Sequence, residues 1–231
     1  MIQIGGLEKS SLLDYPNKVS AIIFTYGCNL RCPYCHNPEL VIEAFDERRE
    51  VTEKYLLSFL KARVGKLDAV VITGGEPLIY DDLDKLIEKI KELGYLVKLD
   101  TNGFLPDRLE KIIKTNLLDY IAMDVKFPKS QYIKISKGRN ATSKIPKSIK
   151  LIMESGIDYE FRTTYVKGIH DMESVEGITK MIEGAKRYYI QNFRPGKTIN
   201  PGLTQENSFS DKELKQIKKI AKKYVKNTQI R

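Results

Sequence analysis

Every cysteine of the 231-residue chain lies within eight consecutive residues. Cys28, Cys32 and Cys35 are separated by three and then two residues. Three thiolates this close together can bind one metal ion or one iron–sulfur cluster without closing a long loop of chain. Since they cannot provide a fourth sulfur, the spacing predicts a site whose fourth ligand is not a cysteine, or whose fourth position is open.

The cysteine loop directly follows a segment that reads as a buried strand. Residues 19–24 form a run of β-branched and apolar side chains, the pattern of a strand covered on both faces. In α/β folds, ligands and catalytic groups gather beyond the carboxyl ends of such strands. We therefore expect the functional site at this edge.

The rest of the chain alternates between predicted strands and helices. Strands are expected at 19–24, 69–73, 95–100, 120–124, 159–166 and 188–193, and helices at 51–64, 81–93, 106–115, 146–155, 172–187 and 211–227. Thr52 and Asp211 are the expected N-caps of two helices, and Gly94 is expected to end a third. Six such units predict a parallel sheet with right-handed crossovers.

The length favours an incomplete barrel, because eight strand–helix units typically need about 250 residues. The fold class expected is α/β, a partial (β/α)6 TIM-like barrel with an open side that a loop of another protein could enter. We expect one domain over residues 1–231, with a core at 18–194 and a C-terminal loop and capping helix at 195–231.

Polar residues follow several of the predicted strands. Glycines there let the backbone approach a ligand, carboxylates suit an ammonium group or a ribose diol, and cations suit a carboxylate, which Arg can pair in bidentate fashion. The candidate binding residues are Gly74, Gly75, Glu76, Asp100, Asp124, Lys126 and Arg162.

At the cysteine loop the chain resembles a known family. Cys-x3-Cys-x2-Cys with Tyr34 before the third cysteine is similar to the signature of radical S-adenosylmethionine (SAM) enzymes. The extension Cys35-His36-Asn37-Pro38 looks like that of glycyl-radical enzyme activating enzymes. Segments 4–7 and 13–16 resemble activators of anaerobic ribonucleotide reductase. The resemblance extends from Ile4 to about Phe193.

The resemblance implies the cofactors and the roles of the site residues. The three cysteines would hold one 4Fe–4S cluster, and the fourth iron would bind the amino and carboxylate groups of SAM. Gly74, Gly75 and Glu76 would meet the amino end, whereas Asp124, Lys126 and Arg162 would lie near the sulfonium and carboxylate. Backbone from Tyr34 to His36 would contact adenine, and Asp100 would hold either the amino group or the ribose. No protein side chain is expected to be catalytic, because the cluster and SAM carry the radical chemistry.

The implied activity is reductive cleavage of SAM to a 5′-deoxyadenosyl radical, which abstracts hydrogen from a glycine of a partner enzyme. Anaerobic ribonucleotide reductase is the first expected partner, and a pyruvate formate-lyase-like enzyme is the second. A flavodoxin- or ferredoxin-type electron donor is implied. The eight further cysteines of activators with an inserted ferredoxin-like domain are absent. A radical SAM enzyme acting on a small molecule or on RNA is the rival enzyme.

Each feature also has a plainer interpretation. The cysteines and His36 could form a structural zinc site in an interaction protein. Cys35 and His36 are adjacent in the sequence, however, so they would have difficulty binding the same tetrahedral zinc ion. Asp100 and Asp124 could be solvated strand ends, and Lys126 and Arg162 could belong to a structural ion pair. His36 could handle protons or make an orienting hydrogen bond. His170 is expected to be an ordinary loop histidine.

Composition restricts the location and the partners. The formal net charge is +9, but the lysines are spread along the chain, which favours a solvated surface over nucleic-acid binding. The basic helix at 212–226 is expected to cap the barrel, with a docking surface for an acidic partner as the alternative. No run of residues is long and apolar enough for a bilayer, and no secretory signal is seen. We therefore expect an anaerobic cytoplasmic enzyme whose thiols stay reduced.

Overall fold

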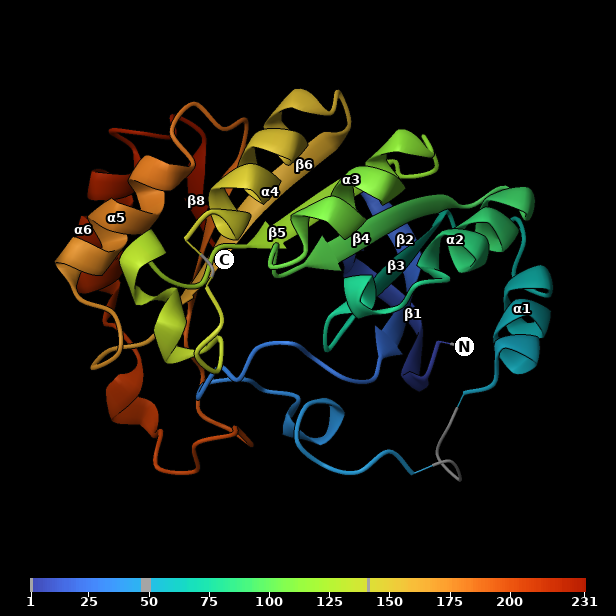
Figure 1. The fold of residues 1–231 in the computed structure, drawn as a ribbon, viewed down its shortest axis with the longest axis horizontal. Coiled ribbons are helices and arrows are strands. Elements are labelled where there is room, and N and C mark those ends of the chain that lie inside the picture. Colours follow the sequence, from blue (N-terminus) through green and yellow to red (C-terminus); the bar gives the residue numbers. More distant parts are fainter. Residues whose placement is uncertain (1, 47–50, 141) are drawn as a thin grey trace. The chain divides into compact units, whose positions relative to one another are not determined.

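The computed structural model describes residues 2–46, 51–140 and 142–231 (Figure 1). The chain divides into two compact units. The first takes in Met1–Asn29, Glu39–Thr101 and Asp107–Ile121, and the second takes in Leu30–Pro38, Asn102–Pro106 and Ala122–Arg231. The order of strands in the sheet follows the chain from β1 to β8. A single domain over 1–231, with its core at 18–194, stays a prediction.

Among the described residues of the first unit, the strands are β1 (Ile4–Tyr15), β2 (Lys18–Thr25), β3 (Ala69–Gly74) and β4 (Leu96–Thr101). β1 is antiparallel to β2, whereas β2, β3 and β4 are parallel. Its helices are α1 (Glu53–Lys61), α2 (Leu83–Glu92) and most of α3 (Pro106–Lys114). Because β2 and β3 are parallel neighbours, their carboxyl ends lie at one edge, with Thr25 opposite Gly74.

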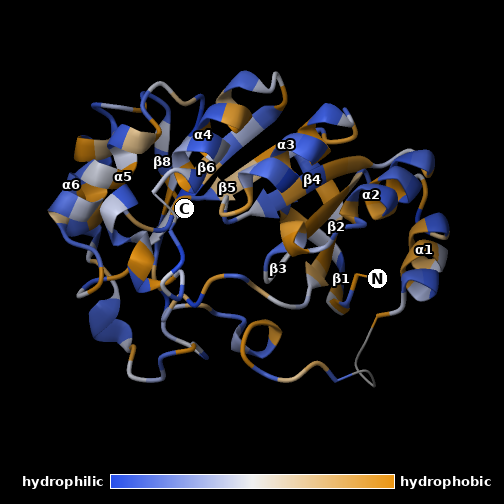
Figure 2. Ribbon diagram, viewed as in Figure 1, coloured by the Kyte–Doolittle hydropathy of each residue, from blue (hydrophilic) through white to orange (hydrophobic). Residues whose placement is uncertain are grey.

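Apolar periodicity explains these elements. In α2 the buried side chains are Leu83, Leu86, Ile87 and Ile90, at the spacing of one helix face, and in Figure 2 this helix carries both hydrophobic and hydrophilic colours. One face of the sheet buries a cluster centred on Ile22 and Val71, with Tyr15, Ala69 and Tyr120. Burying each large aliphatic side chain stabilises the fold by about 1.5–3 kcal/mol.

The second unit contains β6 (Asp158–Tyr165), β7 (Tyr188–Asn192) and β8 (Thr228–Ile230), which are parallel. β5 (Tyr120–Asp124) begins at the end of the first unit and ends in the second. The helices of the second unit are α4 (Lys144–Glu154), α5 (Met172–Met181) and α6 (Asp211–Ala221), with 3-10 turns η4 (Lys129–Lys134) and η5 (Gln205–Asn207). α5 and α6 contact each other.

The predicted α/β class with a parallel sheet is confirmed, and β2 to β7 lie within one residue of the six predicted strands. β1 and β8 were not predicted. The helices predicted at 172–187 and 211–227 are too long, since α5 ends at Met181 and α6 at Ala221.

The helix caps were predicted in part. The Thr52 side chain accepts from Tyr55 N–H, and Gly94 follows α2 with a φ of 88°, so both predictions are confirmed. The prediction that Asp211 caps the last helix is wrong. Ser210 is the N-cap, and it forms a reciprocal capping box with Glu213.

Candidate active site

In the first unit, the loop after β3 is bonded to the residues that lead into Cys28. The Gly75 N–H donates to the Thr25 carbonyl at 2.8 Å, and the Glu76 N–H donates to the Gly27 carbonyl at 2.9 Å. Main-chain hydrogen bonds therefore hold Gly74-Gly75-Glu76 against the residues that lead into Cys28.

Both glycines are required by this close approach. A Cβ on Gly75 would lie 1.9 Å from the Gly27 carbonyl oxygen, so no side chain fits there. Gly74 has a φ of 114°, and a Cβ on it would lie 2.3 Å from the Thr25 nitrogen. The pair forms a cradle of bare backbone beside the residue that precedes Cys28.

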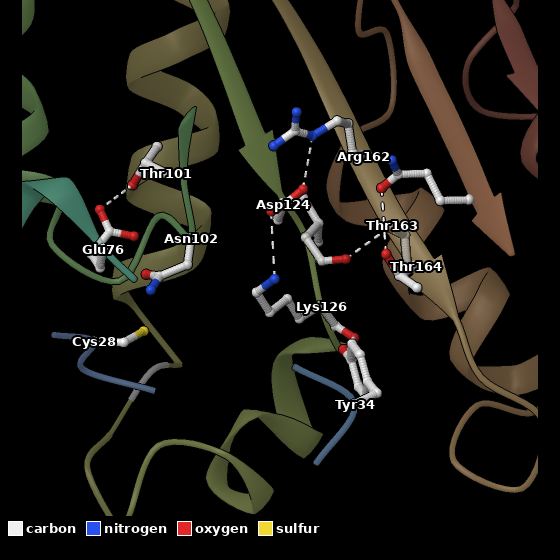
Figure 3. Close-up of polar contacts among 12 residues, drawn as sticks. Cys28, Tyr34, Glu76, Thr101, Asn102, Asp124, Lys126, Arg162, Thr163 and Thr164 are labelled. Atoms are coloured by element: carbon white, nitrogen blue, oxygen red, sulfur yellow. Dashed lines mark hydrogen bonds and ion pairs between the residues drawn. The ribbon is translucent and has the colours of Figure 1, made fainter. Parts of the chain in front are cut away.

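Glu76 is a buried carboxylate held in one position. Its side chain is 1% exposed. Oε1 accepts a hydrogen bond from the Thr101 hydroxyl at 2.8 Å, drawn in Figure 3, and one from the Leu78 N–H at 3.2 Å. Thr101 was not predicted to belong to the site, although it directly follows Asp100 at the end of β4.

Asp100 forms an ion pair with a buried lysine. The Lys98 ammonium lies 3.0 Å from Asp100 Oδ1 and donates to the Asp14 carbonyl at 2.6 Å. Lys98 is 2% exposed. Asp100 is therefore not a solvated strand end, and Lys98 is a partner that sequence reasoning missed because a lysine in an apolar strand gives no signal of its own.

In the second unit, Asp124 lies between two cations. Its Oδ1 accepts from Arg162 Nε at 2.9 Å, and its Oδ2 lies 3.5 Å from the Lys126 ammonium (Figure 3). Burial alone would raise the pKa of Asp124, but Arg162 and Lys126 outweigh it and lower the pKa to about 2. The three charged residues predicted at the ends of β5 and within β6 thus form one cluster.

Lys126 is also within electrostatic reach of the cysteine loop. Burial disfavours its ammonium form. The pKa of Lys126 nevertheless lies well above its usual value, mainly because of the Asp124 carboxylate and then because of Cys32, Tyr34 and Cys35. A cation so placed stabilises thiolates, which are the form of cysteine that binds iron.

Tyr34 and His36 point to different parts of the second unit. The Tyr34 hydroxyl donates to the Lys126 carbonyl at 3.4 Å. His36 Nε2 lies 2.8 Å from the Arg194 carbonyl, and the His36 ring stacks on Phe193. The carbonyl can only accept, so Nε2 donates, which agrees with the predicted orienting hydrogen bond.

A cavity adjoins His36 in the second unit. Its volume is about 450 Å³, and its walls include the ends of β6 and β7. The lining residues are His36, Thr164, Gln191, Asn192, Arg194 and Arg231. This size is within the range of small-molecule sites.

His170 differs from its prediction. It lies in the loop between β6 and α5, as predicted, but it is not an ordinary loop histidine, since it is 3% exposed and is surrounded by aromatic rings. The local sequence has no periodicity that would have revealed its burial.

None of the three cysteines forms a disulfide. Cys28 belongs to the first unit, and Cys32 and Cys35 belong to the second. Among the residues that the structure describes, no group of three His, Cys, Asp or Glu side chains is arranged for a metal ion. The three-cysteine ligand set therefore stays a prediction.

A family model described as the Radical SAM superfamily matches residues 22–182. The chain belongs to the radical SAM superfamily. A protein of Methanocaldococcus jannaschii, provisionally named a glycyl-radical enzyme activating enzyme, is 38% identical over 99% of this chain and 95% of its own length. The pyruvate formate-lyase-activating enzyme of Clostridium pasteurianum is 26% identical, over 86% of this chain and 84% of its own.

Solved structures show the same fold. SuiB of Streptococcus suis bound to SAM aligns with a TM-score of 0.63 and 19% identity, over 89% of this chain. The alignment spans 48% of SuiB, so this chain covers about half the length of that protein. The predicted fold class, a partial barrel of the radical SAM type, is confirmed by this likeness.

The chain is accordingly a radical SAM enzyme, whose cofactors are a 4Fe–4S cluster and SAM. The residues present fit these groups. Glu76 offers a buried carboxylate for an ammonium group, and Lys126 lies near Cys32 and Cys35. Within the described part of the chain, no helix has the length and apolar character needed to cross a membrane.

Proposed function

We propose that this radical SAM enzyme activates a glycyl-radical enzyme. The observation that carries the proposal is the 38% identity to an activating-enzyme relative over 99% of the chain. Anaerobic ribonucleotide reductase is the proposed partner, on the resemblance of segments 4–7 and 13–16. A pyruvate formate-lyase-type partner is the second choice, supported by the Clostridium relative. We further propose a cytoplasmic location and a flavodoxin- or ferredoxin-type donor.

The proposed roles of the site residues follow from their chemistry. Cys28, Cys32 and Cys35 hold the cluster. When bound, the cluster and SAM supply the one-electron chemistry that yields a 5′-deoxyadenosyl radical and then a glycyl radical on the partner. The protein's own task is to bind, orient and shield these groups.

In the first unit, Gly74 and Gly75 admit SAM to the backbone and Glu76 binds its amino group. Asp100 binds the amino group or the ribose. In the second unit, Lys126 and Arg162 bind the SAM carboxylate, because both are cations already oriented by one aspartate. Asp124 fixes these cations and lies near the sulfonium. Backbone from Tyr34 to His36 contacts adenine, with the His36 ring held by Arg194 and Phe193.

The test is electron paramagnetic resonance of a chemically reduced anaerobic mixture with SAM and the anaerobic ribonucleotide reductase from the same source. We expect a glycyl-radical signal on the reductase and stoichiometric 5′-deoxyadenosine. The Cys32→Ala variant is the matched control and should give neither. Formation of 5′-deoxyadenosine without a radical on either type of partner would overturn the activator proposal in favour of a small-molecule or RNA substrate. Zinc without iron or sulfide would overturn the cluster itself.

A further inference from the structure

His170 is a buried histidine that the proposed function does not use. It lies in the second unit, between β6 and α5. Its ring centroid is 4.9 Å from that of Phe127, 5.5 Å from that of Tyr165 and 5.7 Å from that of Tyr34. Tyr34 stands between Cys32 and Cys35 in the sequence, so His170 contacts the cysteine loop through the Tyr34 ring, edge to face.

Both ring nitrogens of His170 have main-chain partners. The Val166 N–H donates to Nδ1 at 3.0 Å. Since an amide N–H can only donate, Nδ1 must present a lone pair. Nε2 then carries the proton and donates to the Lys126 carbonyl at 2.9 Å. The geometry thus requires a neutral imidazole in the Nε2–H tautomer, and burial, which lowers the pKa of His170 to about 4, agrees with it.

The His170 bond completes a set of contacts around the Lys126 main chain. The Lys126 N–H donates to the Tyr132 hydroxyl at 3.0 Å. Its carbonyl accepts from His170 and, at the longer distance of 3.4 Å, from the Tyr34 hydroxyl. The peptide groups on both sides of Lys126 are therefore fixed by hydrogen bonds. The Lys126 side chain extends from this fixed main chain toward Asp124.

We propose that His170 is a positioning residue for SAM binding, acting through the Lys126 main chain and the Tyr34 ring. The inference rests on the proposed roles of Lys126 and Tyr34 in binding SAM. A phenylalanine at 170 would fill the same space, but it would leave the Val166 N–H and a hydrogen-bonding position of the Lys126 carbonyl unsatisfied. Buried groups in that state relax toward other partners, which would move the Lys126 side chain and loosen Tyr34.

The first test is independent of activity. The chain has two histidines, so the imidazole region of a ¹⁵N–¹H correlation spectrum of tag-free protein, with its cluster reconstituted and oxidised, contains two ring systems. The variant His36→Asn assigns them. We expect His170 to show the Nε2–H tautomer and no protonation above pH 5. An Nδ1–H tautomer, or protonation near pH 6.5, would overturn the proposal.

The second test is SAM affinity by anaerobic equilibrium dialysis. His170→Phe should weaken SAM binding by about tenfold, because both hydrogen bonds are lost. His170→Gln keeps a donor for the Lys126 carbonyl and should lie within about threefold of wild type. The control, Thr179→Val, removes a buried bond to the Val175 carbonyl inside α5 and should bind SAM normally.

The outcomes separate the two proposals. If Lys126→Met weakens SAM binding and a folded, iron-loaded His170→Phe does not, the positioning role of His170 is wrong. If Lys126→Met also binds SAM normally, the proposed site itself is wrong. Should His170→Phe fail to fold, normal affinity of His170→Asn, which cannot reach the Lys126 carbonyl, would equally refute the role.

Discussion

The main-chain N–H of Glu76 donates to the carbonyl oxygen of Gly27 at 2.9 Å. This bond fixes the buried carboxylate after β3 relative to the residue that precedes Cys28. It can form only because Gly75 has no side chain, since a Cβ there would overlap the same carbonyl. The residue that precedes Cys28 and the predicted SAM-binding loop after β3 are in this way held together within the first unit.

Gly75→Ala should therefore disturb the cluster site. The new methyl group would lie 1.9 Å from Gly27 O and 3.3 Å from the Cys28 nitrogen, so the loop carrying Cys28 must move. We expect the free energy of unfolding to fall by about 1–3 kcal/mol and iron per chain after anaerobic reconstitution to drop at least by about half. Gly196→Ala is the matched control, because nothing lies within 4 Å of its Cβ position. Equal iron content in the two variants would contradict this account.

Asp100 and Lys98 should be strongly coupled in stability. Both are well buried, with side chains 11% and 2% exposed. Asp100→Asn leaves the Lys98 ammonium without its counter-charge, and we expect a loss of about 3 kcal/mol in denaturant unfolding at pH 7. Adding Lys98→Met to that variant should restore part of the loss, with a coupling energy of about 1–3 kcal/mol. Strictly additive effects would show that the ion pair does not matter.

Asp124→Asn tests the cation cluster of the second unit through pH. Burial opposes the charged form, but Arg162 and Lys126 outweigh it and lower the pKa of Asp124 to about 2. A carboxyl whose folded pKa lies below its unfolded value of about 3.9 stabilises the fold above that value, and the gain disappears as the pH falls through 2. The free energy of unfolding of wild type should exceed that of the variant by about 1–2 kcal/mol at pH 7, after allowing for the partial exposure of the Asp124 side chain.

The control for that experiment is Glu110→Gln, which removes an exposed i,i+4 pair with Lys114. Its effect should be at most about 0.5 kcal/mol. A difference between Asp124→Asn and wild type that did not shrink between pH 4 and pH 2 would contradict the assigned cause. The variant should also bind SAM more weakly, since Lys126 and Arg162 lose the group that orients them.

The strands that position the site could be predicted from sequence because each is a short, continuous apolar run bounded by turns. Strand β1 could not be predicted, because its run of apolar residues is interrupted by Gly5, Gly6 and Asp14. Its pairing with β2 is also irregular. Leu12 and Leu13 are 76% and 89% exposed, so the strand lacks an alternating buried face. β8 is three residues long, too short to distinguish from the end of a helix.

At the site, residues with recognisable chemistry could be found, and those that orient them could not. Asp124 and Lys126 stand at the end of β5 and Arg162 stands within β6. All three were expected to bind a ligand, a role that stays a prediction. Their clustering required the register of β5 and β6. Partners such as Thr101 and Lys98 act through tertiary contacts, which no local pattern records.

His170 should make stability depend on pH above the range of the carboxylates. The pKa of His170 is lowered to about 4, mainly by burial and to a smaller extent by the charge of Lys134. The hydrogen bonds to Lys126 and Val166 and the charge of Asp171 act in the opposite direction and raise it. Between pH 6.5 and 4 the unfolded chain binds a proton here that the folded chain excludes. The stabilisation is complete above pH 6.5 and falls by on the order of 3 kcal/mol as the pH approaches 4.

In His170→Gln this pH dependence should vanish. The free energies of unfolding of wild type and variant should therefore converge on acidification, as measured by anaerobic urea unfolding at pH 7, 6 and 5. Thr179→Val keeps His170 and should retain the wild-type slope, and an unchanged slope in His170→Gln would show that the histidine is not buried neutral.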